Sequence, residues 1–596
     1  MLRLAVAALA LAFSSAAAAT VDYAIDLTSP EHHSGKVRIV FPAGAAGTLD
    51  VKMPAWRTGR YQILNLANGI SEFAAKDERG RALPWQKVDK STWRIQRAGT
   101  GPVTVEYDVY ANELGLRSRH IDDSHAYLDA SAVFMYSDAT RADDVAVSLK
   151  VPAGWRSFSG LQSAGANRFT GANWDILVDS PIETGINRSF AFKEGGRDYE
   201  VVFWGEGNYD ANQTVGDLKK IVAQSPSIWS SYPFQRYVWM IHATDGVGGA
   251  TEHRNSTVIQ IPRNSFQPRE KYLKFLSTAA HEFIHTWNVK AYRAGAMVPY
   301  RYQEENYTDL LWLEEGSTDY FADQFLVRAG IMKPDEYFGA LADAIEHYKR
   351  TPGAALQSVA STSFDEWIAP SGDRATNAWS DIYAEGSMVS WMLDIALLQE
   401  SGGKLSYRNV HDVLYRRYPS EQGKGFNAAD VKAILAELTG HSWDAWWARN
   451  VDAPAPVDFD RLLGSVGLRI SYEDSDKTVP SKPWAGWKAD QAEGGMKLTA
   501  VERGSPAWDA GFAPDDIVTA FDGRRVTKDR FEDALTERKA GDTVTVSYFR
   551  RDQLMQKKLK LGSIPKNKAK VVKVARATPA QKALYQRWLL APYPAN

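Results

Sequence analysis

The sequence predicts a multidomain α+β protein with a β-sandwich-like N-terminal domain, a mainly helical middle domain and a smaller β-rich C-terminal unit. Three observations support this fold class. The chain has 596 residues, too many for a single hydrophobic core. Apolar and polar residues alternate over residues 20–205, and a helical period replaces this pattern from residue 206. The stretch at 450–459, with two prolines, then separates the helices from a second region of short strands and glycines.

The first 19 residues predict a secretory signal peptide. Arg3 gives a positive start, residues 4–13 form an apolar run of ten, and small residues lead to a cleavage site near Ala19. A membrane span needs about 20 apolar residues, so we expect cleavage and no membrane span afterwards. The short alanine-rich leader is typical of bacterial export, which predicts a secreted protein of the periplasm. The chain has no cysteine, which excludes disulfides, thiolate metal sites and a cysteine nucleophile.

Alternating runs predict the strands of the N-terminal β domain, residues 20–205. Examples are "KVRIVF" at 36–41 and "VTVEYDVYA" at 103–111. Helical periods predict the middle domain, residues 206–452, with one strand–glycine loop–strand segment at 237–262. The helical segments begin at residues 214, 268, 308, 334 and 385.

Net charge and missing motifs exclude several functional classes. The formal net charge is −2 and charges of both signs are interspersed, so no overall basic field predicts nucleic-acid binding. No G-x-S-x-G elbow and no phosphate-binding P-loop occur in the sequence, which removes the usual signatures of serine hydrolases and nucleotide-binding enzymes.

The segment "AAHEFIHTWN" at 279–288 predicts a metal site on a helix. Positions four apart share one helical face, so His281 and His285 can offer two imidazole nitrogens to one ion. Glu282 then lies near the open coordination position, where its carboxylate can take a proton from bound water. The alternative is a chance pattern of two surface histidines and a solvated glutamate.

A third protein ligand has to come from further along the chain. Glu304 and Glu305 lie in a polar segment that predicts a loop, whereas Glu314 and Glu315 lie in "LLWLEEGSTDYF", an aromatic-rich segment that predicts a buried helix. A carboxylate buried there needs a partner, and a cation is one. The spacing does not separate Glu314 from Glu315.

These segments resemble the glycyl aminopeptidase family of gluzincin zinc metallopeptidases. The family pairs an H-E-x-x-H helix with a downstream W-x-x-E-G helix, as in "HEFIHTWNVKAYR" and "LLWLEEGSTDYFADQFLVRAG" here. The resemblance implies a thermolysin-like catalytic domain over 206–452, one Zn²⁺ per chain, and Glu315 as the third ligand. Asp319 is either a residue that orients a ligand histidine or a plain surface aspartate. "KMPAWRTGRYQILNLANGI" at 52–70 carries the family's W-x-x-G-x-Y pattern, and "LVDSPIETG" at 177–185 resembles the segment before the catalytic domain.

Two further segments resemble the substrate-binding parts of related aminopeptidases. "GGATEH" at 248–253 resembles their G-x-M-E-N strand, which implies that backbone near Gly249 lies along the substrate and that Glu252 binds the free α-amine. Thr251 and His253 depart from the usual Met and Asn, and a glycine-rich turn with an exposed glutamate is the alternative. "DIYAEGSMVSWML" at 381–393 resembles a Y-x-x-G segment, which implies that Tyr383 stabilises the oxyanion.

The C-terminal unit, residues 453–562, resembles a PDZ domain, and residues 563–596 form a tail with a possible short helix. Gly504-Ser505-Pro506-Ala507 and Asp516-Ile517 match the PDZ pattern, whereas position 515 is Asp where Gly is usual. The resemblance implies a groove for a peptide end. Two tryptophans, Trp484 and Trp487, flank the candidate loop; they suit either a peptide pocket or a surface buried against the catalytic domain, and we favour burial.

We therefore expect a secreted zinc aminopeptidase that hydrolyses the first peptide bond of peptides with a free N-terminus and a small first residue, Gly or Ala. Catalysis is expected from Glu282 and Tyr383, with the metal on His281, His285 and Glu315. Two alternatives are a PDZ-containing peptide-binding protein with a structural metal site and a zinc endopeptidase.

Overall fold

The computed structural model describes residues 19–116, 118–454, 456–472, 483–563 and 569–595. The predicted signal peptide lies outside the described residues, apart from Ala19. No helix in these ranges combines the length and the hydropathy that a membrane crossing requires.

The predicted sheet-rich N-terminal domain is confirmed. Its largest sheet has the strand order β12-β13-β10-β1-β2-β7-β4, with a second sheet β11-β14-β9-β8 and a small one β3-β6-β5. Side chains of β2 and β7 alternate between buried and exposed, as the sequence alternation predicts. The strands that position the sites below are β1 (Thr20–Asp26), β2 (Ser34–Phe41), β7 (Val103–Tyr110), β8 (Arg119–Ile121), β9 (His125–Leu128), β10 (Asp144–Lys150), β11 (Arg156–Ser159) and β14 (Ile182–Gly185).

The remaining elements of this domain are short. They are β3 (Gly47–Lys52), β4 (Ile70–Lys76), β5 (Trp85–Lys87), β6 (Thr92–Arg97), β12 (Gln162–Gly165), β13 (Arg168–Gly171), α1 (Ala130–Val133) and α2 (Trp174–Val178).

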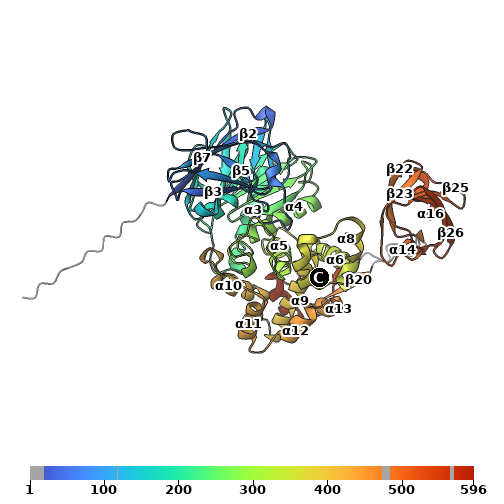
Figure 1. Cartoon of the computed structure of the whole chain (residues 1–596). Coiled ribbons are helices and arrows are strands. Elements are labelled where there is room, and N and C mark those ends of the chain that lie inside the picture. Colours follow the sequence, from blue (N-terminus) through green and yellow to red (C-terminus); the bar gives the residue numbers. More distant parts are fainter. Residues whose placement is uncertain (1–18, 117, 455, 473–482, 564–568, 596) are drawn as a thin grey trace, which may run out of the picture.

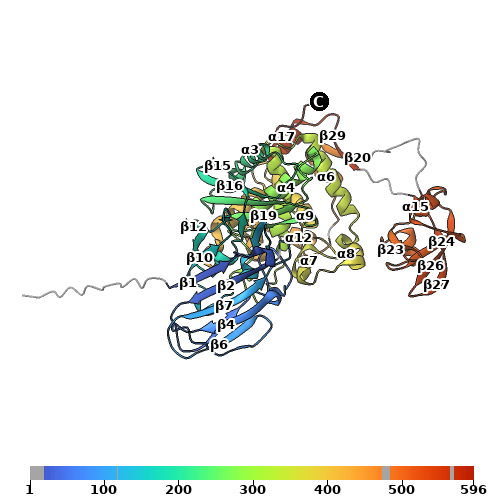
Figure 2. The same cartoon turned by 90° about the horizontal axis from the view of Figure 1, so that it is seen from above.

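A five-stranded sheet and a set of helices form the middle domain (Figures 1 and 2). The strand order is β15-β16-β17-β19-β18, which places β18 at an edge. Its strands are β15 (Arg188–Glu194), β16 (Arg197–Trp204), β17 (Arg236–Ala243), β18 (Gly249–Glu252) and β19 (Ser256–Ile261). We expected the N-terminal domain to extend to residue 205, but β16 pairs in parallel with β17, so β15 and β16 belong to the middle-domain sheet.

The predicted helices of the middle domain are present. The central three are α4 (Arg269–Ile284), α5 (Ser317–Arg328) and α9 (Ala384–Glu400). Helix α5 packs against both α4 and α9, and α4 packs against β18 and β19 of the sheet. The others are α3 (Ala211–Val222), α6 (Pro334–Lys349), α7 (Val359–Asp365), α8 (Gly372–Ala378), α10 (Tyr407–Arg417), α11 (Ala428–Thr439), α12 (Asp444–Asn450) and α13 (Phe459–Ser465).

The C-terminal unit has a hydrophobic core of its own. Strands pair in the order β22-β23-β24-β26-β27, with β25 beside β24, and the unit lies to one side of the main body in Figures 1 and 2. Asp515 has φ +72°, a left-handed conformation that explains why glycine is usual there. Its elements are β21 (Pro483–Trp484), β22 (Trp487–Ala492), β23 (Gly495–Val501), α14 (Pro506–Asp509), β24 (Ile517–Phe521), β25 (Arg524–Arg525), α15 (Lys528–Phe531), α16 (Asp533–Thr536), β26 (Thr543–Arg550), β27 (Gln553–Lys560) and β28 (Gly562–Ser563).

The expected burial of Trp487 against the catalytic domain is wrong. Trp487 lies inside the PDZ-like unit, with its ring stacked on Phe521 at 6.3 Å and edge-on to Phe512 at 5.4 Å. Direct contact with the main body is polar: Asn377 donates to the carbonyl of Val501 at 2.7 Å and accepts from the N–H of Arg503 at 2.8 Å. Aromatic residues of a small core and of a docked surface look alike in sequence, which explains the error.

The chain returns to the main body on both sides of the PDZ-like unit. Strand β20 (Leu468–Tyr472) precedes the unit and pairs in antiparallel fashion with β29 (Ala569–Lys573), which follows it. Helix α17 (Pro579–Leu589) then packs Trp588 against Trp391 of α9, at 5.9 Å between parallel rings. The predicted tail helix therefore exists, and residues 456–472 belong to the main-body core rather than to the unit that we expected to begin at 453.

Candidate metal centre and substrate cleft

Two histidines and one glutamate converge at the C-terminal end of α4. His281 Nε2 lies 2.9 Å from His285 Nε2, and Glu315 Oε2 lies 3.2 Å from His285 Nε2 and 3.8 Å from His281 Nε2. The three side chains come from positions 281, 285 and 315, as the motif spacing and the resemblance implied. Their donor atoms form the mixed imidazole and carboxylate set that a first-row divalent metal prefers.

The other polar atom of each of these side chains is held by a neighbour. His281 Nδ1 lies 2.7 Å from Asp319 Oδ1, and His285 Nδ1 lies 2.9 Å from the carbonyl oxygen of Asn288. The Tyr61 hydroxyl donates to Glu315 Oε1 at 2.5 Å. The atoms that face one another are therefore free to bind a cation, which is the arrangement expected around a metal.

The electrostatics of this cluster also favour a positive charge. Burial alone would lower the pKa of His285, but the Glu315 carboxylate outweighs that effect and raises the pKa to about 10. A cation placed among these groups therefore gains the same stabilisation. The donor set, the buried position and the fixed outer atoms all fit a metal ion.

A π-helical turn, Trp312–Gly316, selects between the two adjacent glutamates. Glu315 points into the cluster, whereas Glu314 Oε1 accepts the N–H of Ala294 at 2.7 Å on the other side. Glu314 is fully buried, and this burial raises its pKa to about 8. The earlier candidate Glu304 lies at the surface, where it pairs with Arg301 at 2.8 Å.

Glu282 is placed beside the metal cluster in a buried position. Its side chain is buried, and its Oε2 has no hydrogen-bond partner among the described residues. Burial raises the pKa of this carboxyl to about 7, while the neighbouring histidines act in the opposite direction. An unpartnered carboxylate beside an open coordination position can accept and return a proton near neutral pH.

Two glycines bring Tyr383 to the same site. Tyr383 directly precedes α9, and its ring centroid lies 6.2 Å from that of His281. A methyl group added at Gly316 would lie 2.4 Å from the Cα of Gly386, so the two segments touch through glycine on both sides. The glycines of the W-x-x-E-G and Y-x-x-G patterns thus allow Glu315 and Tyr383 to share one cleft.

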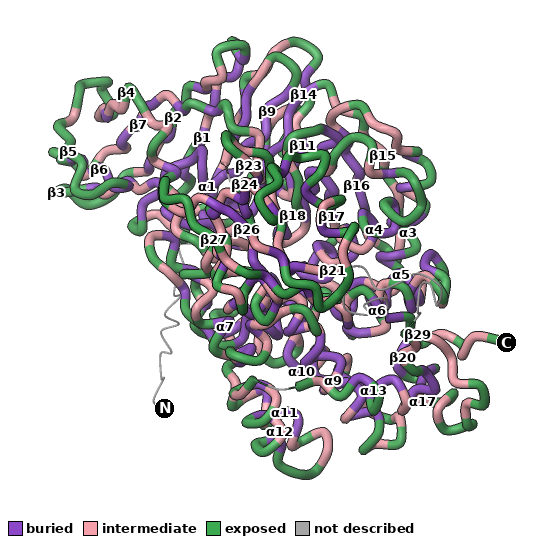
Figure 3. Tube along the Cα trace, turned by 90° about the vertical axis from the view of Figure 1, so that its right-hand side faces the viewer, coloured by how far each residue is buried: buried purple, intermediate pink, exposed green. Residues whose placement is uncertain are grey.

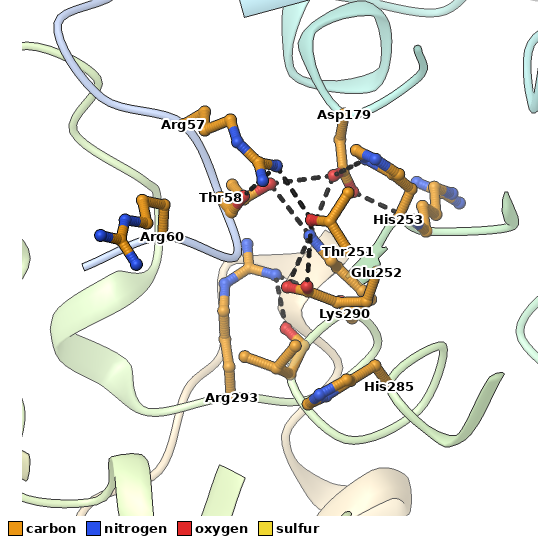
Figure 4. Close-up of polar contacts among 12 residues, drawn as sticks. Arg57, Thr58, Arg60, Asp179, Thr251, Glu252, His253, His285, Lys290 and Arg293 are labelled. Carbon is orange, nitrogen blue, oxygen red and sulfur yellow. Dashed lines mark hydrogen bonds and ion pairs between the residues drawn. The ribbon is translucent and has the colours of Figure 1, made fainter. Parts of the chain in front are cut away.

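Glu252 ends the edge strand β18 and lies in a buried network of charges (Figure 4). Its Oε1 lies 3.5 Å from Lys290 Nζ. Burial opposes ionisation, but the charges of Lys290 and His285 outweigh it and lower the pKa of Glu252. The glutamate is therefore buried and ionised; the exposed glutamate in a glycine turn, considered above, is wrong.

Lys290 joins Glu252 to a second buried acid. Its ammonium donates to Asp179 Oδ1 at 2.9 Å and to Thr58 Oγ1 at 3.0 Å (Figure 4). Burial opposes ionisation of Asp179, but Lys290 and His253 lower its pKa. His253 Nδ1 lies 3.1 Å from the same Asp179 oxygen. The histidine that stands in place of the Asn of related enzymes therefore has Asp179 as its polar partner.

Gly249 begins β18 with φ +120°, a conformation that favours glycine, and it is exposed. Strand β18 pairs with β19 on one side only within the described residues. Its other edge pairs with no strand of the described residues, and an extended peptide can add to such an edge by backbone hydrogen bonds. A cavity of about 750 Å³ lies beside Gly248 and is lined by residues 64–66, 68, 69, 110–116, 118 and 119 of the N-terminal domain.

The N-terminal domain supplies functional residues that our sequence reasoning did not single out. Tyr61 contacts the metal ligand Glu315, and Arg57 donates to Thr251 Oγ1 at 2.9 Å. A methyl group added at Gly59 would lie 2.4 Å from Glu252 Oε2, so this backbone approaches Glu252 closely. The W-x-x-G-x-Y pattern at 56–61 is the sequence feature that could have identified these residues, because Arg57, Gly59 and Tyr61 belong to it.

Comparison with known proteins supports the same domain organisation. Family models match the Peptidase M61 N-terminal domain at 22–186, the M61 glycyl aminopeptidase at 274–389 and a PDZ domain at 467–561. A crystal structure of an aminopeptidase N family protein from Idiomarina loihiensis has 26% identity and a TM-score of 0.87, covering 96% of this chain and 100% of that chain.

A more distant solved structure is a mutant M1 zinc metallopeptidase from Deinococcus radiodurans bound to a Tyr-Ser-Ala substrate. It has 12% identity and a TM-score of 0.47, covering 74% of this chain and 95% of that chain. Among curated proteins, none matches this chain.

Proposed function

Since the chain belongs to the M61 glycyl aminopeptidase family and is a metallo-aminopeptidase, we propose that it removes small N-terminal residues from peptides with one bound zinc ion. The observation that carries this proposal is the convergence of three free donor atoms, on His281, His285 and Glu315, beside the unpartnered carboxylate of Glu282. A purely structural metal site has no use for such a base.

Zinc suits the donor set of two imidazoles and one carboxylate, which leaves a fourth position for water or substrate. When bound there, zinc would polarise the scissile carbonyl and lower the pKa of its water toward neutrality. Asp319 and the Asn288 carbonyl fix the ring orientations of the two histidines, and Tyr61 fixes Glu315.

Glu282 takes the proton of the attacking water and then delivers it to the leaving amine. Its buried position beside the metal cluster allows this carboxylate to perform both steps. Tyr383 donates its hydroxyl proton in a hydrogen bond to the oxyanion as the carbonyl becomes tetrahedral, which lowers the barrier without strengthening ground-state binding.

Glu252 makes the reaction an exopeptidase reaction. Its ionised carboxylate pairs with the ammonium of the first residue and so sets the first peptide bond over the metal. The open edge of β18, beginning at Gly249, holds the peptide backbone in an extended form. The proposal has three further parts. The enzyme prefers Gly or Ala at the first position and is exported to the bacterial periplasm. Its PDZ groove binds a peptide end.

The test uses purified protein and four reporters: Gly-, Ala- and Leu-amides and one N-acetylated peptide, each with and without chelator. The proposal predicts release from Gly and Ala reporters that chelator abolishes and zinc restores. Efficient cleavage of the N-acetylated peptide would instead indicate an endopeptidase. No cleavage of any reporter by zinc-loaded protein would favour a peptide-binding protein with a structural metal.

A further inference from the structure

A second group of metal-ligating side chains lies in the N-terminal domain, outside the cleft. His120 belongs to β8, Asp122 to the turn after it, and His125 begins β9. One nitrogen of each histidine and one Asp122 oxygen lie within 4.8 Å of one another. The set has the same composition as the active-site cluster, two imidazoles and one carboxylate.

The outer atoms of Asp122 and His125 are also held by neighbours. Asp122 Oδ1 accepts from the N–H of Ser124 at 2.8 Å and of His125 at 3.0 Å, which leaves Oδ2 at 2.8 Å from His120 Nε2. His125 Nδ1 lies 3.0 Å from Glu183 Oε1. The carboxylate behind an imidazole repeats the pairing of Asp319 with His281 and is typical of metal-binding histidines.

Two buried ring nitrogens in this group have no partner. His125 is fully buried and its Nε2 makes no hydrogen bond among the described residues; His120 is 8% exposed and its Nδ1 makes none. Trp204 stacks on the His125 ring at 3.5 Å between centroids and covers one face of it. The unpaired Nε2 of His125 has lost its hydration without gaining a hydrogen bond, so an ion bound there would supply the missing partner.

The charges around the group are not balanced by protein cations. Among the ion pairs of the described residues, Glu183 pairs only with His125 and His242. Asp122 pairs only with His120. The adjacent Arg119 donates to backbone carbonyls instead.

The neighbouring triad of His125, Glu183 and His242 is less suited to an ion. His242 Nε2 lies 3.0 Å from Glu183 Oε2, and His242 Nδ1 lies 3.3 Å from Gln260 Nε2, so both ring nitrogens have partners. All three side chains are completely buried, whereas the Asp122 side chain is 26% exposed and leaves a route for an ion and its waters. The triad of His125, Glu183 and His242 therefore supports the group of His120, Asp122 and His125 and does not itself bind an ion.

We propose that His120, Asp122 and His125 bind a second divalent ion of the zinc type, separate from the catalytic metal. Imidazole ligands exclude Mg²⁺ and Ca²⁺, which prefer oxygen donors. The ion fixes the β8–β9 hairpin, and His125, Glu183 and His242 continue the connection into β17 of the middle-domain sheet. These are buried stretches of β9, β14 and β17 (purple in Figure 3). The ion therefore joins the two domains whose junction holds the cleft.

The test compares Asp122→Asn with Asp123→Asn. Asn at 122 keeps the oxygen that caps the turn but replaces the metal-facing oxygen with an amide nitrogen, which does not bind a cation. Asp123 is the next residue, exposed and outside the group. After dialysis against excess Zn²⁺ and removal of free ion, elemental analysis should give about two zinc ions per chain for the wild type and Asp123→Asn, and about one for Asp122→Asn.

The variant His281→Ala counts the catalytic ion separately. It should lose the ion at His281, His285 and Glu315 and keep the ion at His120, Asp122 and His125. Cobalt substitution of His281→Ala should then give visible absorption bands that Asp122→Asn removes from the double variant. Should Asp122→Asn fail to fold, diffraction data from wild-type crystals at the zinc absorption edge decide the question. A wild-type chain that saturates at one zinc ion, with no anomalous peak between His120 and His125, would overturn the proposal.

Discussion

Glu252→Ala tests how the cleft recognises a free N-terminus. In the structure, Glu252 is 5% exposed, and Lys290 Nζ lies 3.5 Å from its carboxylate. Removal of the carboxylate does not strand Lys290, because Asp179 still accepts from it at 2.9 Å. The variant should therefore fold, and its main defect should be in substrate binding.

The size of that defect follows from the charges. Two unit charges at about 4 Å in an effective dielectric of 20 attract by about 4 kcal/mol, and desolvation of the ammonium offsets part of this. Lys290 remains in the variant and repels the substrate ammonium. We expect a loss of about 2–4 kcal/mol in transition-state binding, which is roughly 30- to 900-fold in kcat/KM.

The assay compares kcat/KM for Ala-amide and N-acetyl-Ala-amide reporters in the wild type, Glu252→Ala and a control, Glu304→Ala. Glu304 is an exposed glutamate whose side chain is 63% accessible. The loss should be confined to the substrate with the free amine, and the control should match the wild type. An equal loss on both reporters would show that Glu252 only maintains the fold of the cleft, and our assignment would be incorrect.

Three further predictions concern the support of the site and the C-terminal chain. Tyr61→Phe removes the hydroxyl that holds Glu315 Oε1, so zinc affinity measured by chelator competition should fall about 10- to 100-fold while the fold is unchanged by circular dichroism. Trp588→Ala empties a fully buried site and removes the hydrogen bond from the Trp588 ring N–H to the Tyr320 hydroxyl, so calorimetry should show about 3–5 kcal/mol of destabilisation. An unchanged Tm would contradict the packing. Replacing residues 473–568 by a short Gly-Ser loop joins Tyr472 to its strand partner Ala569, so the main-body transition should stay within about 2 °C of the wild type and Gly- to Ala-reporter rate ratios within a few-fold.

Local patterns predicted the parts of the site that lie on single elements. The spacing of His281 and His285 places both rings on one helical face, and the structure brings their Nε2 atoms to 2.9 Å. Spacing alone did not separate Glu314 from Glu315, because an ordinary α-helical turn gives no reason to prefer one. The π-helical turn at 312–316 inserts the extra residue that turns Glu315 inward.

Contacts between distant segments were beyond local patterns. Lys290 lies 111 residues from Asp179, and Tyr61 lies 254 residues from Glu315, and neither pair has a spacing rule. The C-terminal boundary failed for the same reason: β20 and β29 pair across the whole PDZ unit. The preferred docking of Trp487 failed because a tryptophan that fills a small core has the same local sequence context as one that docks.

The most direct test of the central claim is to measure zinc content and turnover of Glu282→Gln together. Gln keeps the shape of the buried side chain and removes the proton acceptor, while the three metal ligands remain in place. We expect the variant to retain the catalytic zinc, which is the zinc ion that His281→Ala loses. Its kcat on Gly- and Ala-amides should fall by at least about 10²- to 10⁴-fold. Near-native turnover by a zinc-loaded Glu282→Gln enzyme would contradict this expectation.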